Sequence, residues 1–479
     1  MPALADQRYD ELPKPLASMS PNYDVIIVGA GPAGIFAALG LSQQGNLSVA
    51  LLDKGPDIDQ RVCPARRPGG QCIHCQICFL LCGWGGAGAF SDGKLTLSPA
   101  VGGHLPNIIG EERTAQLIER VDGVYVGYGA SGPVHGTRID EIEDLEKQSA
   151  LAGLRLLKVP IRHMGTEHSA DILHAMRADL IRQGVQIADR TAVTGILVEN
   201  GRATGVVTTG GETWRGRFVV VAPGREGAQW LSGVAAELKL SLTVNPVDLG
   251  VRVELPAEVL RPLTDLLYEP KLHYYSRAFD DKIRSFCVCP YGEVVAEWVD
   301  DVMTVNGHSY ADRRTANTNF ALLVSKNFTE PFKDPIAYGK SIARLANLLS
   351  GGIIVQRLGD LEQGRRSTAQ RLARCIVTPT LEEATPGDLN LVLPYRYVVN
   401  LLEMLHAMDK IAPGVASRHT LLYGVEVKFY SSRLRLTPEL ETEVDNLFAA
   451  GDGAGITRGL VQASASGLVV AQAILERVS

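Results

Sequence analysis

The hydrophobic positions near the start of the chain form blocks rather than a strict alternation. Val25 to Val28 is a continuous apolar run, which is typical of a strand buried on both faces of a parallel sheet. A helix is predicted over Ile35 to Leu41, and a second strand over Leu47 to Leu52. This order predicts a βαβ unit, in which the helix crosses over between two parallel strands.

Alternating patterns dominate the middle of the chain. The segments Ile196 to Thr208 and Thr213 to Val221 alternate around Asn200-Gly201 and Gly210-Gly211, which are signals for hairpin turns. Further strands are predicted over Leu249–Leu255, Arg284–Val288 and Val294–Val299, and helices over Ile336–Leu349 and Tyr397–Ala407. We expect these strands to form an antiparallel sheet that the helices cover.

The composition is that of a soluble enzyme with more than one core. The 479 residues are too many for one compact core, and 46% of them are hydrophobic and 21% charged. The net charge of −6 gives no basic surface for nucleic acid. No apolar run reaches the roughly 18 residues that would span a membrane. The first twenty residues are polar and interrupted by proline, so we expect a leader without a signal peptide, and a cytoplasmic protein.

A glycine-rich string follows the first strand and indicates a dinucleotide site. It reads Gly29-Ala30-Gly31-Pro32-Ala33-Gly34. Its first glycine makes the tight turn, the second lets the backbone approach a pyrophosphate, and the third lets the helix pack closely on the strand. The phosphates are expected at the free N–H groups of the helix N-terminus. Asp53, followed by Lys54, ends the second strand, where an acid binds the ribose hydroxyls of adenosine.

Two further motifs stand far from the first. A short apolar stretch ends in Gly451-Asp452-Gly453 before a helix of small residues, and the strand ending at Val221 leads into Ala222-Pro223-Gly224-Arg225. Both resemble motifs of the glutathione-reductase-like flavoproteins. The resemblance implies FAD, with Asp452 near the ribityl and pyrophosphate groups. It also implies that the C-terminal helix aims its dipole at the flavin, which would stabilise negative charge on the reduced ring. Arg458 and Gly459 precede that helix, so Arg458 is expected to touch flavin or an anionic substrate.

A second glycine-rich stretch, GGAGAFSDGKL, follows the second strand by about thirty residues. Together with RSFCVCPYGEVV, NGHSY, NTNFALLV, VKFYSSR and GDGAGITRGLVQASASG, it makes nearly the whole chain similar to one group of flavoproteins. These are the largely uncharacterised FAD-dependent dehydrogenases known as NAD(FAD)-utilizing dehydrogenases. The resemblance implies that the loop lies against the flavin and ribityl chain. Its expected contacts are Gly85, Gly86, Ala87, Gly88, Ser91, Gly93 and Lys94.

These motifs predict an α/β fold built from two domains. We expect a discontinuous Rossmann-type FAD-binding domain, glutathione-reductase-like, because its first and last motifs lie near opposite ends of the chain. The second domain is expected to be an α+β substrate domain with an antiparallel sheet. The expected division is a leader at 1–20, an FAD-binding domain at 21–99, 165–240 and 426–479, and a substrate domain at 100–164 and 241–425.

Five of the eight cysteines precede the second glycine-rich stretch. Cys72, Cys75, Cys78 and Cys82 have ferredoxin-type spacing, and Cys63 stands nine residues upstream. An iron–sulfur cluster beside the flavin, a zinc site and a redox disulfide all remain open. A fourth reading makes residues 72–82 one helix, whose cysteines pack as small apolar side chains.

Few residues of the expected substrate domain suggest chemistry. Cys287 and Cys289 alternate along a predicted strand, so both face one side; they either line the active site or pack as small core residues. Arg284, Tyr395 and Lys428 are polar residues on apolar strands or at the ends of elements, so each either pairs with a neighbour or faces the pocket.

The motifs together predict an FAD-dependent oxidoreductase. It is expected to move a hydride between flavin and a small organic substrate, at a C–C or C–N bond. A flavin monooxygenase and an iron–sulfur-linked electron-transfer protein are the alternatives. No second nucleotide domain is evident, so NAD(P)H or ferredoxin would dock transiently. The sequence does not identify the substrate or the oligomeric state.

Overall fold

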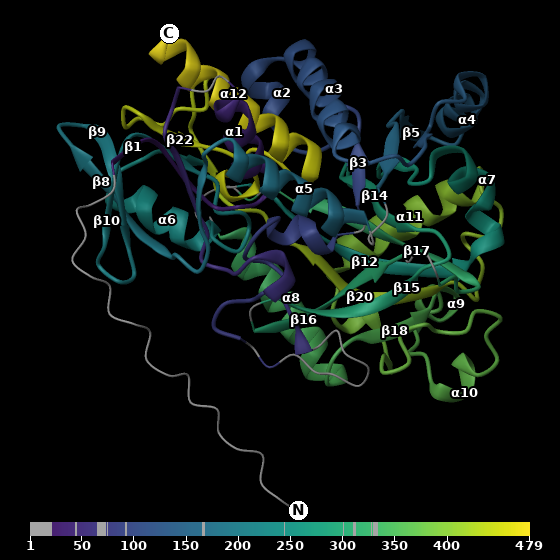
Figure 1. The fold of residues 1–479 in the computed structure, drawn as a ribbon. Coiled ribbons are helices and arrows are strands. Elements are labelled where there is room, and N and C mark those ends of the chain that lie inside the picture. Colours follow the sequence, from purple (N-terminus) through teal and green to yellow (C-terminus); the bar gives the residue numbers. More distant parts are fainter. Residues whose placement is uncertain are drawn as a thin grey trace, which may run out of the picture.

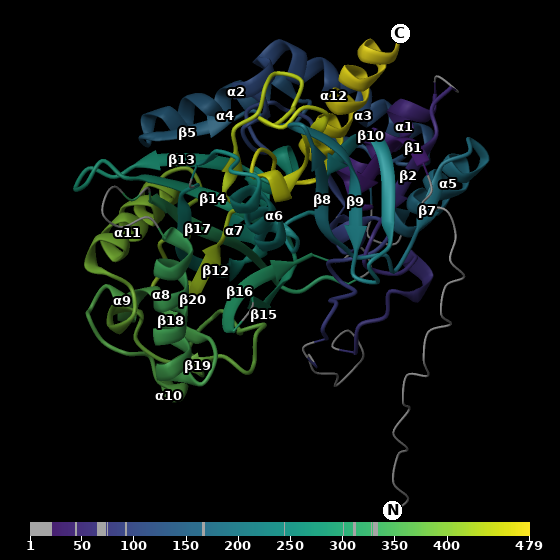
Figure 2. The same cartoon turned by 90° about the vertical axis from the view of Figure 1, so that its left-hand side faces the viewer.

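The computed structural model describes residues 22–43, 46–64, 73, 75–91, 93–164, 168–243, 245–299, 301–309, 313–326, 328 and 334–479. Two bodies are visible, each built on its own sheet (Figure 1; Figure 2). One contains both ends of the described chain, and the other contains most of its middle. The first body is therefore discontinuous in sequence.

The first body is organised by a seven-stranded sheet whose centre is parallel. Its order is β7-β2-β1-β10-β9-β8. The strand β22 pairs with the C-terminal end of β10, where Val219 to Val221 lie beside it. The strands are β1 (Asn22–Val28), β2 (Val49–Leu52), β7 (Gln186–Ala188), β8 (Val193–Glu199), β9 (Arg202–Thr208), β10 (Thr213–Val221) and β22 (Leu447–Ala449). The parallel pairs β1 with β2 and β1 with β10 confirm the predicted βαβ arrangement.

Two helices from opposite ends of the chain support this sheet. The helix α1 (Pro32–Ser42) packs directly on α12 (Leu460–Val478), as Figure 1 shows. Their backbones are in close contact, because a Cβ atom added at Gly467 would stand 2.1 Å from the carbonyl oxygen of Ala33. Around this pair lie α2 (Leu105–Ile109), α3 (Glu111–Gly127), α5 (His168–Arg182) and α6 (Ala228–Glu237).

The second body is built on an eight-stranded, almost wholly antiparallel sheet of order β19-β18-β20-β12-β17-β14-β13-β5. The strands are β5 (Leu154–Leu157), β12 (Val247–Pro256), β13 (Lys271–Tyr275), β14 (Lys282–Cys289), β17 (Asn317–Lys326), β18 (Ile354–Arg357), β19 (Thr385–Pro386) and β20 (Leu421–Lys428). Its helices are α4 (Ile139–Leu151), α7 (Ala257–Leu267), α8 (Pro335–Ser350), α9 (Leu358–Leu361), α10 (Ala369–Leu372) and α11 (Tyr395–Asp409). The predicted antiparallel sheet, with its helical cover, is confirmed for Leu249–Leu255 and Arg284–Val288. The predicted strand Val294–Val299 lies outside this sheet, because it pairs with the neighbouring strand β16.

Three smaller sheets complete the strands of the described chain. They are the three-stranded sheet of β3 (Lys94–Thr96), β6 (Ile161–His163) and β4 (Val134–His135), the pair β11 (Leu242–Thr243) and β21 (Arg433–Leu434), and the hairpin β15 (Glu293–Val299) and β16 (Val302–His308). Four 3-10 turns complete the described elements: η1 (Ile58–Gln60), η3 (Gly86–Phe90), η4 (Leu389–Leu391) and η5 (Asp452–Ala454).

The packing divides the chain differently from the expected domain boundaries at two places. Residues 105–130 contribute Ile118, Val121 and Tyr125 to the core around the first sheet, although the sequence division places them in the substrate domain. The strand β20 runs through position 426, where the division starts an FAD-binding segment, and Val427 belongs to the second core. Both differences arise because tertiary packing, rather than motif position, decides where a segment belongs.

Within the described residues, no helix has both the length and the apolar character needed to cross a membrane.

The α1–α12 contact predicts a sharp difference between two glycine substitutions. In Gly467→Ala the new methyl group would collide with the backbone of α1, so we expect the free energy of unfolding to fall by about 1–3 kcal/mol. Gly233, inside α6, has no atom within 4 Å of an added Cβ. Gly233→Ala should therefore leave the stability unchanged or raise it by up to about 1 kcal/mol. Urea unfolding of both variants measures the two changes in stability. Equal unfolding midpoints for Gly467→Ala and Gly233→Ala would contradict the close contact between α1 and α12.

Candidate functional site

The predicted glycine motifs come together at one edge of the first sheet. Gly29 follows β1 and abuts the chain after β10, since its added Cβ would lie 2.2 Å from the carbonyl oxygen of Ala222. The loop before η3 reaches the same place, because the N–H of Gly85 donates to the carbonyl of Ala30 at 2.8 Å. The C-terminal motif arrives there too, where Gly453 approaches the carbonyl oxygen of Gly224. Loops from four distant segments therefore meet at the carboxyl ends of parallel strands.

Several glycines at this edge face open space. A Cβ added at Gly31 would meet only Gly86, 3.9 Å away, and nothing lies within 4 Å of one added at Gly224 or Gly459. Gly31 is also the N-cap of α1, and it makes no side-chain cap hydrogen bond. An uncapped helix start beside open backbone is the arrangement that accepts a phosphate group.

Other predicted cofactor residues shape this edge rather than face open space. Pro32 opens α1, Ala33 and Gly34 pack closely in its first turn, and Ala87 and Gly88 lie within η3. The Ser91 hydroxyl donates to the carbonyl of Gly88 at 2.8 Å. Gly93 has a φ of 66°, which favours glycine, and its carbonyl accepts from Met164.

Asp53 ties the first motif to the second glycine-rich loop. One carboxylate oxygen accepts the N–H of Ala30 at 2.8 Å, and the other accepts the N–H groups of Gly55 and Gly83, both at 2.8 Å. The prediction gave this residue only a ribose contact. A carboxylate offers about four acceptor positions, so three backbone bonds leave room for one ribose hydroxyl.

Arg61 holds the segment between Asp53 and the glycine-rich loop. The guanidinium is buried and donates to the carbonyl oxygens of Phe79 (2.8 Å), Leu80 (3.0 Å) and Trp84 (2.6 Å). It also lies over the ring of Phe90, 4.7 Å from the centroid. Burial lowers the pKa of Arg61 to about 10, so the group stays charged at neutral pH.

The cysteine segment does not form the helix considered for residues 72–82. Residues 76–83 are turns and bends, so that interpretation is wrong. Cys75 is exposed, Cys63 and Cys78 are half-buried and Cys82 is buried, while Cys72 lies outside the described residues. No three His, Cys, Asp or Glu side chains within the described ranges are arranged to hold a metal ion. A site that includes Cys72 stays a prediction.

Cys82 has a partner of its own. Its thiol is hydrogen-bonded to Glu226, and burial together with the charge of Glu226 raises the pKa of Cys82 well above its ordinary value. Glu226 forms an ion pair with Lys54. This contact links the residue after Asp53 to the turn that follows β10. The positive charge of Lys54 lowers the pKa of Cys82, but burial and Glu226 outweigh it.

The C-terminal motif is fixed by its own aspartate. Asp452 accepts the Thr457 hydroxyl at 2.8 Å and the N–H of Gly459 at 3.3 Å, and Arg225 lies 4.0 Å away. Burial raises the pKa of Asp452. Gly451 is held by the Ser466 hydroxyl at 3.0 Å. The loop therefore keeps a defined shape immediately before α12 begins.

Lys94, at the end of the glycine-rich loop, contacts the second body. It is buried, and its ammonium donates to the carbonyl oxygen of Val288 in β14 at 3.1 Å. Glu269 lies 3.9 Å from the same ammonium and also pairs with Lys271. The predicted cofactor residue at the end of the loop thus contacts the strand that carries both candidate cysteines.

The strand β12 has a polar face that the sequence analysis missed. Its residues alternate, with Leu249, Val251 and Val253 in the second core. Asp248, Arg252 and Glu254 occupy the opposite face, yet each is at most 1% exposed. Alternation of this kind ordinarily predicts a solvated face. The pattern was visible in the sequence, but nothing in it shows that other elements cover this face.

Arg252 is the centre of this polar face. It lies 3.4 Å from both carboxylate oxygens of Glu426 and donates to Asn319 at 2.8 Å and to the carbonyl of Cys287 at 2.7 Å. Lys428 shares the same carboxylate, at 3.0 Å from Glu426. A buried charge network of this kind stabilises little unless every member is paired, so it indicates specificity rather than stability.

The two candidate cysteines come together at a bulge. The register between β14 and β17 shifts between Phe286 and Cys289, and Cys287 has a φ of 46°, in the left-handed region. The two sulfur atoms lie 3.9 Å apart, with the Cys289 sulfur 3.2 Å from Arg252. A hydrogen bond to Cys287 and burial raise the pKa of Cys289 well above its ordinary value. Cys287 is the half-buried member of the pair.

Arg284 lies on the same polar surface, but Tyr395 does not. Arg284 pairs with Asp248 at 2.5 Å and donates to the Tyr430 hydroxyl at 2.8 Å. Burial alone would raise the pKa of Asp248, but the charge of Arg284 and the hydrogen bonds from Ser325, Tyr430 and Arg284 together lower it. Tyr395 is 77% exposed at the start of α11, with its ring edge-on to Phe279. The structure gives Tyr395 no place beside the other candidates.

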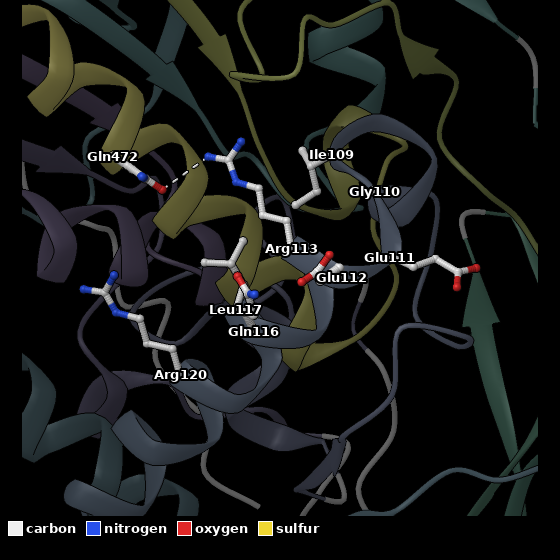
Figure 3. A pocket seen from close by; sticks show the side chains of 9 residues that line it. All are labelled: Ile109, Gly110, Glu111, Glu112, Arg113, Gln116, Leu117, Arg120 and Gln472. Carbon is white, nitrogen blue, oxygen red and sulfur yellow. Dashed lines mark hydrogen bonds between the residues drawn. The ribbon is translucent and has the colours of Figure 1, made fainter.

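A surface hollow lies away from these loops. It has a volume of about 640 Å³ and is open to solvent between α3 and α12 (Figure 3). Arg113 reaches across it to Gln472 at 3.2 Å, and Glu111, Glu112 and Arg120 line its rim. None of the predicted site residues lines it.

Comparison with known protein families assigns flavin-related descriptions to three parts of the chain. Residues 24–63 match the FAD binding domain, residues 111–291 match the FAD dependent oxidoreductase family, and residues 246–429 match the family described as FAD-dependent protein, C-terminal domain-like.

Individual relatives are distant. An uncharacterized protein of Clostridium beijerinckii is 28% identical over 475 residues, covering 94% of this chain and 80% of that protein. Glycine oxidase from Geobacillus kaustophilus is 15% identical, with 95% of each chain covered and a TM-score of 0.39. L-proline dehydrogenase from P. horikoshii is 14% identical, with 96% of this chain and 95% of that chain covered and a TM-score of 0.41.

The contacts of Asp53 predict a combined loss of stability and cofactor affinity on substitution. In Asp53→Asn one oxygen becomes an NH₂ group that cannot accept the backbone N–H groups now bound there. We expect the free energy of unfolding to fall by about 1–3 kcal/mol and FAD to bind at least about tenfold more weakly. Urea unfolding and FAD titration measure these effects. Asp59→Asn is the matched control, because Asp59 is 73% exposed and contacts only His174 among the ion pairs of the described chain.

The residues at the sheet edge fit the cofactor that the family descriptions name. The helix start at Gly31 is uncapped, the glycines around it leave open backbone, and Asp53 retains an acceptor position for ribose. Four loops converge there, including both motifs expected to contact the two halves of a dinucleotide. The chain is therefore an FAD-dependent oxidoreductase.

Proposed function

We propose that the enzyme moves a hydride between FAD and a small organic substrate held against the polar face of the second sheet, with oxidation or reduction of a C–C or C–N bond. The observation that carries this proposal is the contact of Lys94 with β14. Lys94 directly follows the loop expected to cover the flavin, and its ammonium bonds the carbonyl between Cys287 and Cys289. Flavin and substrate face would thus be adjacent.

FAD supplies the hydride chemistry, and the protein residues bind, orient and exclude water. Phe286 offers a partly buried apolar surface with Arg284, Lys271 and Lys428 around its ring, at 4.6, 5.4 and 5.9 Å from the centroid. An apolar carbon of the substrate would lie on the ring while its polar groups meet these cations. The burial of the surrounding charges favours a site from which bulk water is excluded.

The thiol pair has a place in this proposal as well. Oxidation of a C–C or C–N bond releases a proton along with the hydride. Cys287 is the half-buried thiol at the bulge, and Cys289 behind it stays protonated. We assign Cys287 as the residue beside the reacting carbon that orients it and can relay that proton.

The glutathione-reductase-like subclass also belongs to the proposal. The order of the three motifs and the closing of the sheet by β22 support it. The domain division is proposed with the boundaries that packing suggests, so that residues 105–130 join the FAD-binding body.

Lys94 gives the test of the proposed site. Anaerobic mixing of the FAD-loaded enzyme with a panel of amino acids, organic acids, NADH and NADPH should identify compounds that bleach the flavin absorption. In Lys94→Met we expect the FAD content to be retained and flavin reduction by the active compound to slow at least about tenfold, because the link between loop and β14 is lost. The flavin absorption measures both quantities.

Lys410→Met serves as the control, since Lys410 is an exposed residue at the end of α11. It should reduce its flavin at the unaltered rate. If no compound of the panel reduces the wild-type flavin, or if Lys94→Met reduces it as fast as the control, the proposed site is wrong.

A further inference from the structure

A group of cations gathers where the second sheet meets the C-terminal motif. Arg155, His273 and Arg284 stand in one cross-strand row, because His273 is in register with Arg155 on β5 and with Arg284 on β14. Lys282 precedes Arg284 by two residues and therefore shares its face of the strand. One edge of the sheet thus presents three permanent positive charges around a histidine.

Two more cations join the group, Arg458 in the C-terminal loop and Arg433 in the neighbouring strand β21. The guanidinium of Arg458 stacks on Tyr430, 3.5 Å from the ring centroid, and the Tyr430 hydroxyl accepts from Arg284 and donates to Asp248. The N–H of Arg458 is held by the carbonyl of Gly102 at 2.6 Å. Arg433 lies beside this loop in β21. We call Arg155, Lys282, Arg284, Arg433 and Arg458 the cationic cluster.

The cluster lacks matching negative charge. Asp248 is committed to Arg284, Ser325 and Tyr430. Asp452 also acts on Arg458, but it already accepts from Thr457 and Gly459. Within the described part of the chain, the remaining four members of the cluster form no ion pair: Arg155, Lys282, Arg433 and Arg458.

The positive charges of the cluster act on neighbouring titratable groups and contribute to lowering their pKa values. Burial, followed by the charges of Lys282, Arg284 and Arg155, lowers the pKa of His273 to about 3. Burial, followed by Arg458 and Arg433, lowers the pKa of His104 to about 4. The pKa of Lys282 is lowered as well, by burial first and by Arg284 next. Half-buried cations that repel one another cost folding free energy, which a bound anion would offset.

We propose that the cationic cluster binds a small ligand with at least two negative charges, which is the anionic part of the substrate or of a nicotinamide reductant. This inference names the ligand class for the proposed function and rests on it for the placement beside flavin. The shared chemistry is an oxyanion, either carboxylate or phosphate. Arginine binds both in two-point fashion, and the neighbouring lysine adds a point charge.

Equilibrium binding to the FAD-loaded enzyme tests the proposal without turnover. The probes are acetate, succinate, inorganic phosphate and NADP⁺, which has no hydride to give, followed through the change in flavin absorption and through the shift in thermal midpoint. We expect succinate or phosphate to bind more tightly than acetate, and the binding to weaken as ionic strength rises. Tight binding of succinate would assign the site to a carboxylate substrate. Tight binding of phosphate and NADP⁺, with weak binding of succinate, would assign it to the reductant.

Two variants and a control complete the experiment. Lys282→Gln and Arg155→Gln should each weaken binding of the probe about tenfold. Arg155 is exposed, so its substitution leaves the fold intact even if Lys282→Gln does not. Lys147→Gln removes an exposed charge on α4 and should bind as the wild type does. Failure of every multiply charged probe to bind, or equal affinities in all variants, would overturn the anion site.

The two proposals fail separately. An enzyme whose flavin is reduced by a neutral compound, but which binds none of these anions, retains the proposed function and loses the anion site. An enzyme that binds the anions, but whose flavin no compound reduces, retains the site and loses the proposed function.

Discussion

The carboxylate of Asp53 is the interaction on which the cofactor edge of the first body depends. Its two oxygens bind backbone N–H groups of the first glycine motif, of its own turn and of the second glycine-rich loop. A side chain that bound ribose alone would leave these three segments to find each other through weaker contacts. Because buried N–H groups must be paired, the acid organises the loops before any ligand arrives. Its position after β2 thus serves the fold directly.

The second body differs from the first in that one face of its sheet is both polar and buried. Its sheet has an ordinary apolar face covered by helices, and an opposite face where Asp248, Arg252 and Glu254 are buried without being apolar. Apolar side chains of similar volume would often be more stable there. Glu254 illustrates the cost, since burial raises its pKa despite bonds to Tyr423, Thr380 and Asn317.

The sequence predicted the elements well where local patterns decide them. The βαβ unit, both hairpins and the strands β12 and β14 of the second sheet follow from periodicity and turn residues. Val294–Val299 is also a strand as predicted, but it pairs with β16 in a separate hairpin. It also predicted that the glycine motifs would meet. It could not show that Asp53 binds backbone, that β12 is covered on both faces, or that the bulge brings Cys287 beside Cys289. Each of these depends on neighbours far away in the chain. Tyr395 was misjudged for the same reason, because a polar residue at a helix start gives no sign of what surrounds it.

The pairing of β10 with β22, and of α1 with α12, has a consequence for the order of folding. The helix α1 lies near the start of the described residues, but the surface that supports it belongs to α12, more than 400 residues later. Bringing such distant segments together costs loop-closure entropy before any contact repays it. The first body is therefore completed only after the segments of the second body, which lie between α1 and α12 in the chain, have been made.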